Sequence, residues 1–174
     1  FSYIGRTYRL LSKQYGNMDA VTYLYDNHRR LTGKESRNKN NDLINKYAYG
    51  YNKVHMKTFE QRHHDGGKGD TFAYDDVYRL TGTKFDTPEP TNPETDQYAK
   101  SWATKYDKVD NILQLIKNQN SQITEINPTI EEENHKKLHQ YTKFDGWSFD
   151  YDKNGNTTQK GTQKFFYDYR NQMV

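Results

Sequence analysis

The strongest constraint on the fold of this chain is an apolar pattern between Glu94 and Asn118. Large apolar and aromatic side chains recur there every three or four residues, namely Tyr98, Trp102, Tyr106, Val109, Leu113 and Ile116. This spacing places all of them on one face of an α-helix. The pattern therefore predicts a central helix whose apolar face is covered by the rest of the chain.

Weaker helical patterns occupy much of the remaining sequence. They lie in segments that glycines follow, at residues 1–15, 19–31, 41–63 and 72–80. Glycine is common just after a helix because it adopts the left-handed conformation easily. Asn127 and Pro128 have the residue types that begin helices, so another helix is predicted there. The predicted fold class is mainly α, a multi-helix, bundle-like domain.

A β-hairpin is predicted at the C-terminal end. Residues 147–151 alternate between aromatic and polar side chains, Asn154-Gly155 is a favoured tight-turn pair, and residues 165–169 can form the returning strand. Residues 1–174 are expected to form a single domain. The proline-rich connection at residues 83–94 is the best candidate for a subdomain boundary, because proline disfavours helix there.

A faint internal similarity links three short stretches. They begin Tyr8-Arg-Leu-Leu, His28-Arg-Arg-Leu-Thr-Gly and Val77-Tyr-Arg-Leu-Thr-Gly, at unequal spacing. Repeat arrays usually show a fixed period. These stretches are therefore interpreted as similar helix endings and not as a repeat.

Composition narrows the chemistry and indicates an origin. The chain has 16 tyrosines and no cysteine, which predicts a tyrosine-rich core and excludes disulfides, thiolate metal sites and cysteine nucleophiles. No apolar run is long enough to span a membrane. The abundance of Asn, Lys and Tyr without Cys is similar to that of exported proteins from low-GC Gram-positive bacteria. This similarity implies an extracellular or cell-surface protein, with a cytoplasmic location left open.

A basic stretch lies in the first half of the chain and comprises Arg29, Arg30, Lys34, Arg37 and Lys39. Such a patch can contact the phosphates of nucleic acid or an anionic wall polymer. The alternative is a solvated helix end and loop, since basic side chains favour helix C-termini.

A histidine–aspartate pair carries the most specific catalytic hypothesis. His64-Asp65 is followed by glycines and a lysine, and resembles the motif of the HD-domain phosphohydrolases. The resemblance implies a helical fold, a divalent metal cofactor and hydrolysis of a phosphate ester by a metal-activated water. The catalytic residues would be His64 and Asp65, and the metal ligands would be His28, His64, Asp65 and Asp107, with Asp110 as an alternative to Asp107.

Three other motifs offer further metal chemistry. The sequence His63-His64-Asp65-Gly66 also resembles the start of HNH nuclease motifs, in which a histidine is the general base. His135 and His139 have the spacing of zinc ligands on one helix. Residues 150–156 resemble the first half of a calcium loop, but Gly161 stands where the bidentate glutamate belongs. Each motif also has an explanation without metal. These explanations are, in the same order, a polar turn, an exposed helix face and a hairpin turn.

The C-terminal aromatic residues suggest a binding function. The stretch from Trp147 onward resembles the aromatic hairpin repeats of wall- and glucan-binding surface proteins, which present ring faces to sugar or choline. The binding residues would be Trp147, Phe149, Tyr151, Tyr167 and Tyr169. The leading hypothesis is therefore a non-catalytic binding or interaction domain without a cofactor, recognising a glycan, a wall polymer or a protein partner. A metal-dependent phosphohydrolase or nuclease comes second, and a nucleic-acid-binding module third.

Overall fold

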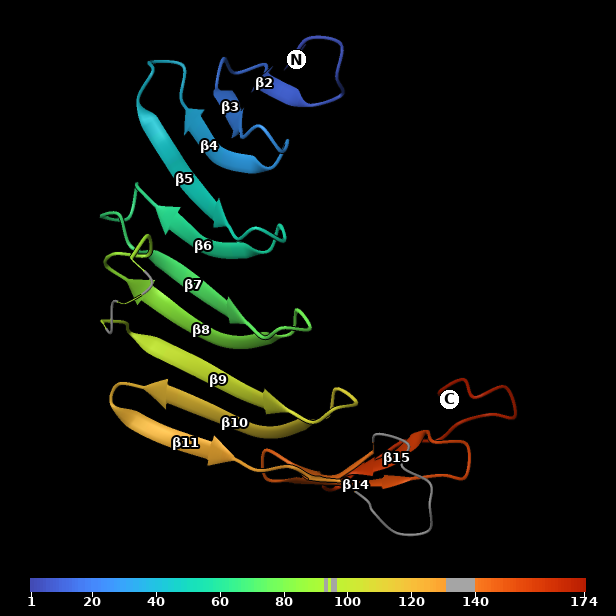
Figure 1. Cartoon of the computed structure of the whole chain (residues 1–174). Helices are drawn as coiled ribbons and strands as arrows, with labels where there is room; N and C mark the ends of the chain where they lie inside the picture. The colour runs from blue at the N-terminus through green and yellow to red at the C-terminus, as the bar shows by residue number, and fades with distance from the viewer. Residues whose placement is uncertain (93, 95–96, 131–139) are drawn as a thin grey trace. The chain divides into compact units, whose positions relative to one another are not determined.

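The computed structural model describes residues 1–92, 94, 97–130 and 140–174 and shows an all-β protein (Figure 1). No described residue is helical, so the prediction of a mainly α, bundle-like domain is wrong. The strands form two antiparallel sheets, of eleven and five strands, and follow chain order within each. Every connection within a sheet therefore joins neighbouring strands.

The strands of the first sheet are short and numerous. They are β1 (Ser2–Tyr3), β2 (Leu10–Gln14), β3 (Ala20–Tyr25), β4 (Leu31–Arg37), β5 (Leu43–Tyr51), β6 (Lys57–Arg62), β7 (Gly69–Tyr74), β8 (Leu80–Thr87), β9 (Lys100–Tyr106), β10 (Ile112–Gln119) and β11 (Gln122–Ile126). The second sheet contains β12 (Thr129–Ile130), β13 (Tyr141–Phe144), β14 (Trp147–Tyr151), β15 (Thr157–Lys160) and β16 (Gln163–Lys164). Because β12 occupies Thr129–Ile130, the predicted helix start at Asn127-Pro128 is wrong as well.

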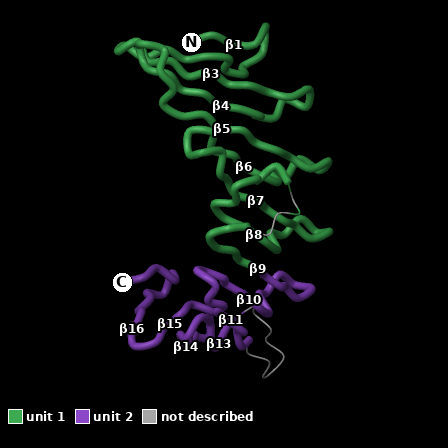
Figure 2. The backbone as a smooth tube through the Cα atoms, turned by 90° about the vertical axis from the view of Figure 1, so that its left-hand side faces the viewer, with its two compact units in different colours: residues 1–102 green, residues 103–174 purple. Residues whose placement is uncertain are grey.

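The chain divides into two compact units, residues 1–102 and residues 103–174 (Figure 2). The division falls after Trp102 and not within the proline-rich connection at residues 83–94. The first residues of that connection belong to β8. No helix in the described parts of the chain is long and apolar enough to cross a membrane.

The apolar pattern that predicted a central helix is divided between two strands and a turn. Trp102 lies in β9, Val109 in the following turn and Leu113 in β10. Trp102 is 47% exposed and Leu113 is 48% exposed, so neither side chain is a core residue. The spacing mimics a helix because a five-residue turn separates the two short strands. The expectation of an apolar helical core is therefore wrong.

Few side chains are fully buried in either unit. Val21 and Ile126 are the only buried large aliphatic residues in the described part of the chain, at 6% and 7% exposure. Most strand residues are half-buried, as expected for sheets whose faces remain partly accessible. The two sheets therefore have no large fully buried core in the described residues.

Tyrosines gather on one face of the first unit's sheet. Tyr23 is paired with Lys34, and Lys34 is paired with Tyr47, so these side chains share a face. Tyr49 follows on the same face, and its ring stacks on that of Tyr47 at a centroid distance of 6.3 Å. These half-buried tyrosines form an aromatic sheet face, and no tyrosine in the described residues is fully buried.

Candidate functional site

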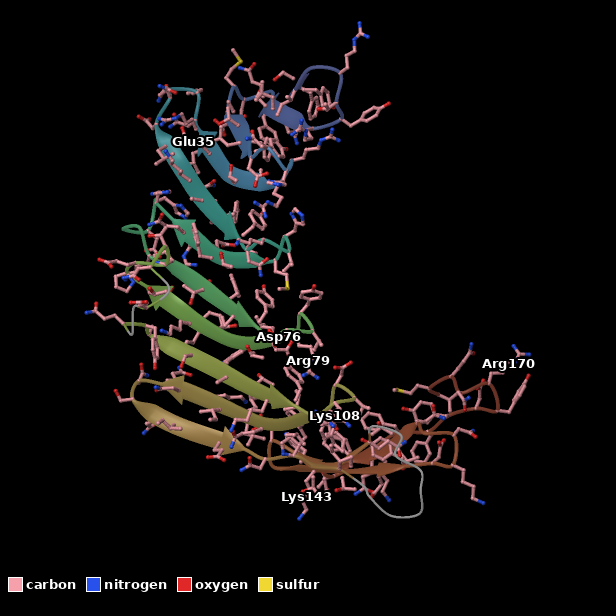
Figure 3. The ribbon with its side chains drawn as sticks, in the orientation of Figure 1. Glu35, Asp76, Arg79, Lys108, Lys143 and Arg170 are labelled. Carbon is pink, nitrogen blue, oxygen red and sulfur yellow. The ribbon has the colours of Figure 1, made fainter. Side chains whose placement is uncertain are left out.

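The most distinctive local structure is a five-residue turn whose first residue is aspartate or asparagine. In the β7–β8 turn, Asp75 Oδ1 accepts hydrogen bonds from the backbone N–H of Val77 and of Arg79, at 3.1 and 2.9 Å. Asp75 Oδ2 accepts a third from Arg79 Nε at 2.7 Å. Figure 3 shows Arg79 at this turn. One carboxylate thus satisfies backbone donors that the turn leaves without a ladder partner.

The same pattern recurs along the whole chain. A first-residue Oδ1 accepts from the backbone N–H groups of the third and fifth residues in the turns that begin at Asp26, Asn38, Asn52, Asp107, Asp152 and Asp168. Asparagine and aspartate serve equally well because the acceptor is one side-chain oxygen in both. The repeated turns therefore form a structural repeat of β-hairpins.

The fourth residue of each turn has a left-handed backbone. Arg29, His55, Tyr78 and Asp110 have φ values between 68° and 71°, and Gly155 has a φ of 87°. This conformation produces the bulge that joins a tight turn to a twisted antiparallel pair. The side-chain cap of the first residue compensates for the cost of this conformation in a residue other than glycine.

A tyrosine at the end of the preceding strand completes the repeat. The hydroxyl of Tyr25 donates to the carbonyl of Leu10, that of Tyr51 to Leu31, and that of Tyr74 to Lys57. The second unit repeats this contact from Tyr151 to the carbonyl of Tyr141 and from Tyr167 to that of Thr157. Each acceptor lies at or near the start of the preceding strand. Each tyrosine therefore ties its own hairpin to the previous one.

The turn carboxylates have lowered pKa values. The side-chain amide of Asn156 donates to Asp152, and the backbone amides of Asn156, Asn154 and Gly155 support it, so the pKa of Asp152 lies below its ordinary 3.8. Desolvation is the largest influence on Asp75 and raises its pKa, but hydrogen bonds from Arg79 and Val77 together lower it. Both groups are therefore ionised acceptors at neutral pH.

The sequence contained a signal for this repeat that the helical interpretation missed. A tyrosine directly precedes the aspartate or asparagine at residues 25–26, 51–52, 74–75, 106–107, 151–152 and 167–168. The similar stretches at His28 and Val77 each run through a turn into the start of a strand, β4 or β8. Their interpretation as helix endings, and not as a repeat, is wrong.

The structure does not bring the proposed metal ligands together. His28 lies in the β3–β4 turn, while His64 lies in the β6–β7 connection, at the opposite end of the strands. His28 packs edge-on against His55. His64 Nδ1 lies 3.1 Å from the backbone N–H group of Lys46. No group of three or more potential ligands occurs among the described residues.

The carboxylates of the same hypothesis have structural partners. Asp65 forms a 3.6 Å ion pair with Arg62 Nε. Asp107 belongs to the second unit and caps its own turn, while Asp110 occupies the left-handed position of that turn. The proposed zinc pair His135 and His139 lies outside the described residues. In the stretch that resembles the first half of a calcium loop, both Asp152 oxygens accept hydrogen bonds from Asn156.

The basic residues do not form one continuous patch. Arg30 pairs with Asp26 at 2.7 Å, and Arg37 pairs with Glu35 at 2.6 Å. Lys34 lies on the tyrosine face, whereas Arg29 and Lys39 are exposed in two different turns. These turns lie at opposite ends of β4, so the cluster seen in the sequence is separated in space.

The proposed binding aromatics fall into two groups. Tyr151 and Tyr167 use their hydroxyls to tie hairpins together. Trp147 is 47% exposed and Tyr169 is 86% exposed, whereas Phe149 is half-buried. Trp147 covers Gly161, where an added Cβ would lie 2.6 Å from the indole ring. Trp147 and Tyr169 are therefore the members of this set that can contact a partner.

A cleft of about 590 Å³ lies beside Trp147 in the second unit. It is lined by Thr124 to Asn127, by Thr129, and by Lys143 to Ser148, which form the end of β13, the β13–β14 turn and the start of β14. Glu125 is one of these lining residues and accepts hydrogen bonds from Asn127 and Gln114, which lower its pKa. The cleft therefore combines an aromatic ring with a fixed carboxylate.

No protein-family model matches the sequence, and no curated protein is significantly similar to it. The fold is similar to part of a crystal structure of TcdB2-TccC3-TEV, with a TM-score of 0.58 and 14% identity. It is also similar to part of a Photorhabdus luminescens Tc holotoxin pore, with a TM-score of 0.57 and 15% identity. Each comparison covers 95% of this chain and 10% of the matched chain. At these identities the likeness establishes the fold alone.

Proposed function

We propose that this chain is a non-catalytic structural and interaction segment of a larger β-sheet scaffold. The observation that carries this proposal is the repeated tyrosine–Asx turn. In this turn, an aspartate or asparagine side chain closes the hairpin, and the tyrosine hydroxyl joins the hairpin to the previous one. In repeat proteins, units of this kind stack on their neighbours, and the stack presents an extended surface to partners.

Surface exposure supports an interaction role. Leu24 is 63% exposed and Ile123 is 70% exposed, and Trp102 and Trp147 are also accessible. They belong to different strands, and exposed large apolar side chains of this kind are available to contact another protein segment. A partner or the rest of a longer chain would cover them.

The structural similarity supports the scaffold role. The matched proteins are toxin-complex chains about ten times longer than the matched region. By analogy with them, the scaffold would belong to a large toxin-complex-like protein, and an exported or surface location is part of this proposal. The glycan or wall-polymer partners considered from the sequence would meet the exposed Trp147 and Tyr169.

Hydroxyl-radical footprinting tests the scaffold role. The isolated chain and the full-length protein that contains it would be oxidised in parallel, and modification would be measured at Trp102, Trp147 and Tyr169. We expect at least threefold protection of these residues in the full-length protein, because neighbouring segments cover them. Tyr51 is the internal control, since its hydroxyl is already bonded within the sheet.

Phosphoesterase assays test the non-catalytic part. We expect hydrolysis of phosphomonoester and phosphodiester substrates at background rates with Mg²⁺, Mn²⁺ or Zn²⁺. Activity that disappears in both His64→Ala and Asp65→Ala would overturn the proposal. So would equal footprinting of the isolated chain and the full-length protein.

A further inference from the structure

The two sheets end in strands of very different length. β1, β12 and β16 contain two residues each, and the pairings of β1 and β12 are irregular. β11 contains five residues and pairs with β10 without a bulge. Short or irregular edge strands prevent unwanted pairing, and so do lysine and proline within the edge. β11 is regular and contains neither lysine nor proline; its one charged residue is Glu125, so its outer edge is open to a strand that suits this negative charge.

The outward-facing groups of β11 follow from its hairpin. Asn120 and Ser121 both have positive φ, which identifies a two-residue turn of type I′ between the paired residues Gln119 and Gln122. That closing pair exchanges hydrogen bonds, so Gln122, Thr124 and Ile126 bond toward β10. The N–H and C=O groups of Ile123 and Glu125 point away from β10. Within the described residues, no strand pairs with this side of β11.

The cleft lies along part of this strand. Thr124, Glu125 and Ile126 of β11 line it, and so does Trp147 of β14. Its volume of about 590 Å³ is within the usual range of binding clefts, about 300 to 1,000 Å³. An extended chain paired with β11 would have room for its side chains beside the indole ring.

The charge of Glu125 distinguishes between two candidate partners, a second copy of β11 and a strand with a basic side chain. If a second copy of β11 paired antiparallel about Thr124, Ile123 would face Glu125 of the copy. The two Glu125 carboxylates would then lie at a diagonal spacing of about 7–8 Å. Hydrogen bonds from Asn127 and Gln114 keep Glu125 ionised, so these carboxylates would repel each other. A strand that carries lysine or arginine opposite Glu125 avoids the repulsion and gains an ion pair.

We propose that the outer edge of β11 binds an extended polypeptide segment by strand addition, with a basic side chain opposite Glu125 and an apolar side chain against Trp147. The proposal rests on the interaction role proposed above and specifies the kind of partner. The backbone of Ile123 and Glu125 supplies the affinity, and the cleft supplies the side-chain preference.

Fluorescence anisotropy with a labelled, end-capped peptide tests this site. The probe Thr-Val-Thr-Lys-Thr-Val-Thr has the required alternation and charge. Backbone N-methylation of one alternate set of its amides should weaken binding at least tenfold, while methylation of the other set should change it less than twofold. This asymmetry arises only when one edge of the peptide is hydrogen-bonded. Equal effects of the two sets would overturn the proposal.

Substitutions in the protein locate the site. Ile123→Pro removes one outward N–H and leaves the β10 pairing intact, so we expect at least tenfold weaker binding with an unchanged circular dichroism spectrum. Glu125→Lys should make the protein prefer a peptide with glutamate in place of lysine. Trp147→Ala should weaken binding at least threefold. Tyr8→Ala is the control, because Tyr8 is an exposed aromatic residue that belongs to the other unit.

Two other outcomes would also overturn strand addition. Binding of cellohexaose in competition with the peptide would assign the cleft to a glycan. A dimer in light scattering that Ile123→Pro converts to a monomer would assign the edge to a second copy. The scaffold role fails independently, because it depends on footprinting in the full-length protein and not on this peptide.

Discussion

The hydroxyl of Tyr51 donates a 2.8 Å hydrogen bond to the backbone carbonyl of Leu31 across two neighbouring strands. Desolvation raises the pKa of Tyr51, and the nearby Lys57 and Arg30 only partly oppose it, so the hydroxyl remains a donor over the physiological range. This contact joins one hairpin to the previous one. Removing this hydrogen bond therefore tests how strongly adjacent hairpins are coupled.

Removing this hydroxyl should weaken the first unit. We expect Tyr51→Phe to lower the free energy of unfolding by about 1 kcal/mol, the usual contribution of one hydrogen bond. Urea denaturation followed by circular dichroism measures the change. Tyr8→Phe should have no measurable effect, since Tyr8 is fully exposed. Equal effects of the two substitutions would show that the contact does not couple the hairpins.

The carboxylate of Asp75 should contribute more to the free energy of unfolding than that of the neighbouring Asp76. Asp75→Ala removes the acceptor of two backbone N–H groups and the partner of Arg79, so we expect a loss of about 1–3 kcal/mol in urea denaturation. Asp75→Asn retains the Oδ1 acceptor and should recover most of that loss. Asp76→Ala is the adjacent control, because Asp76 is exposed (Figure 3), and should change the stability by less than about 0.5 kcal/mol.

Stability should decrease in acid. The pKa values of Asp26, Asp75 and Asp152 are lower in the folded protein than their ordinary 3.8. Groups of this kind favour folding above their unfolded pKa, and the advantage disappears as the pH falls through the folded pKa. The melting temperature should therefore be constant from neutral pH to about 5 and decrease below about 4. Asp152→Asn should flatten the acid slope, and an unchanged slope would assign acid sensitivity to other carboxylates.

Gly50 should not tolerate a side chain. Phe59 is its cross-strand partner, and an added Cβ would lie 2.0 Å from the Phe59 ring. We expect Gly50→Ala to cost about 1–3 kcal/mol in thermal or urea denaturation, as overpacking usually does. Gly16→Ala is a suitable control, because nothing lies within 4 Å of its added Cβ. Combining Gly50→Ala with Phe59→Leu should recover part of the loss.

Calcium should leave the Asp152 turn unaffected. Its carboxylate already accepts hydrogen bonds from Asn154 and Asn156, and binding an ion would break them. We expect no shift in melting temperature between millimolar calcium and EDTA. A stabilising shift that Asp152→Asn removes would contradict this interpretation of the turn.

The sequence allowed some local features to be predicted but not the fold class. The strand at Trp147–Tyr151 is confirmed, because strict alternation is a strong local signal. Asn154-Gly155 lies in the turn that follows, but this is a five-residue turn in which only Gly155 has a positive φ, and not a two-residue turn. The predicted return strand at residues 165–169 is wrong, since the partner of β14 is Thr157–Lys160. The rules for tight turns would have predicted a return strand that begins closer to Asn154-Gly155.

The helical prediction failed for a physical reason. Short strands separated by five-residue turns place apolar residues at intervals that coincide with a helical period, as Trp102, Val109 and Leu113 do. Intrinsic preference did not prevent the error, because Lys, Gln and Leu in β10 favour helices. The decisive signal was the tyrosine followed by aspartate or asparagine. This pair matters because the tyrosine hydroxyl donates a hydrogen bond to a preceding strand. Composition and periodicity do not reveal that bond.

The alternation of the turns between the two ends of the strands has a consequence for sequence change. Each hairpin contacts only its neighbours and carries its own closure, as at Asp75, so loss or duplication of one hairpin pair would preserve the orientation of all later ones. Loss of a single strand would instead reverse the direction of everything after it. Length variation in such a protein should therefore occur in even numbers of strands.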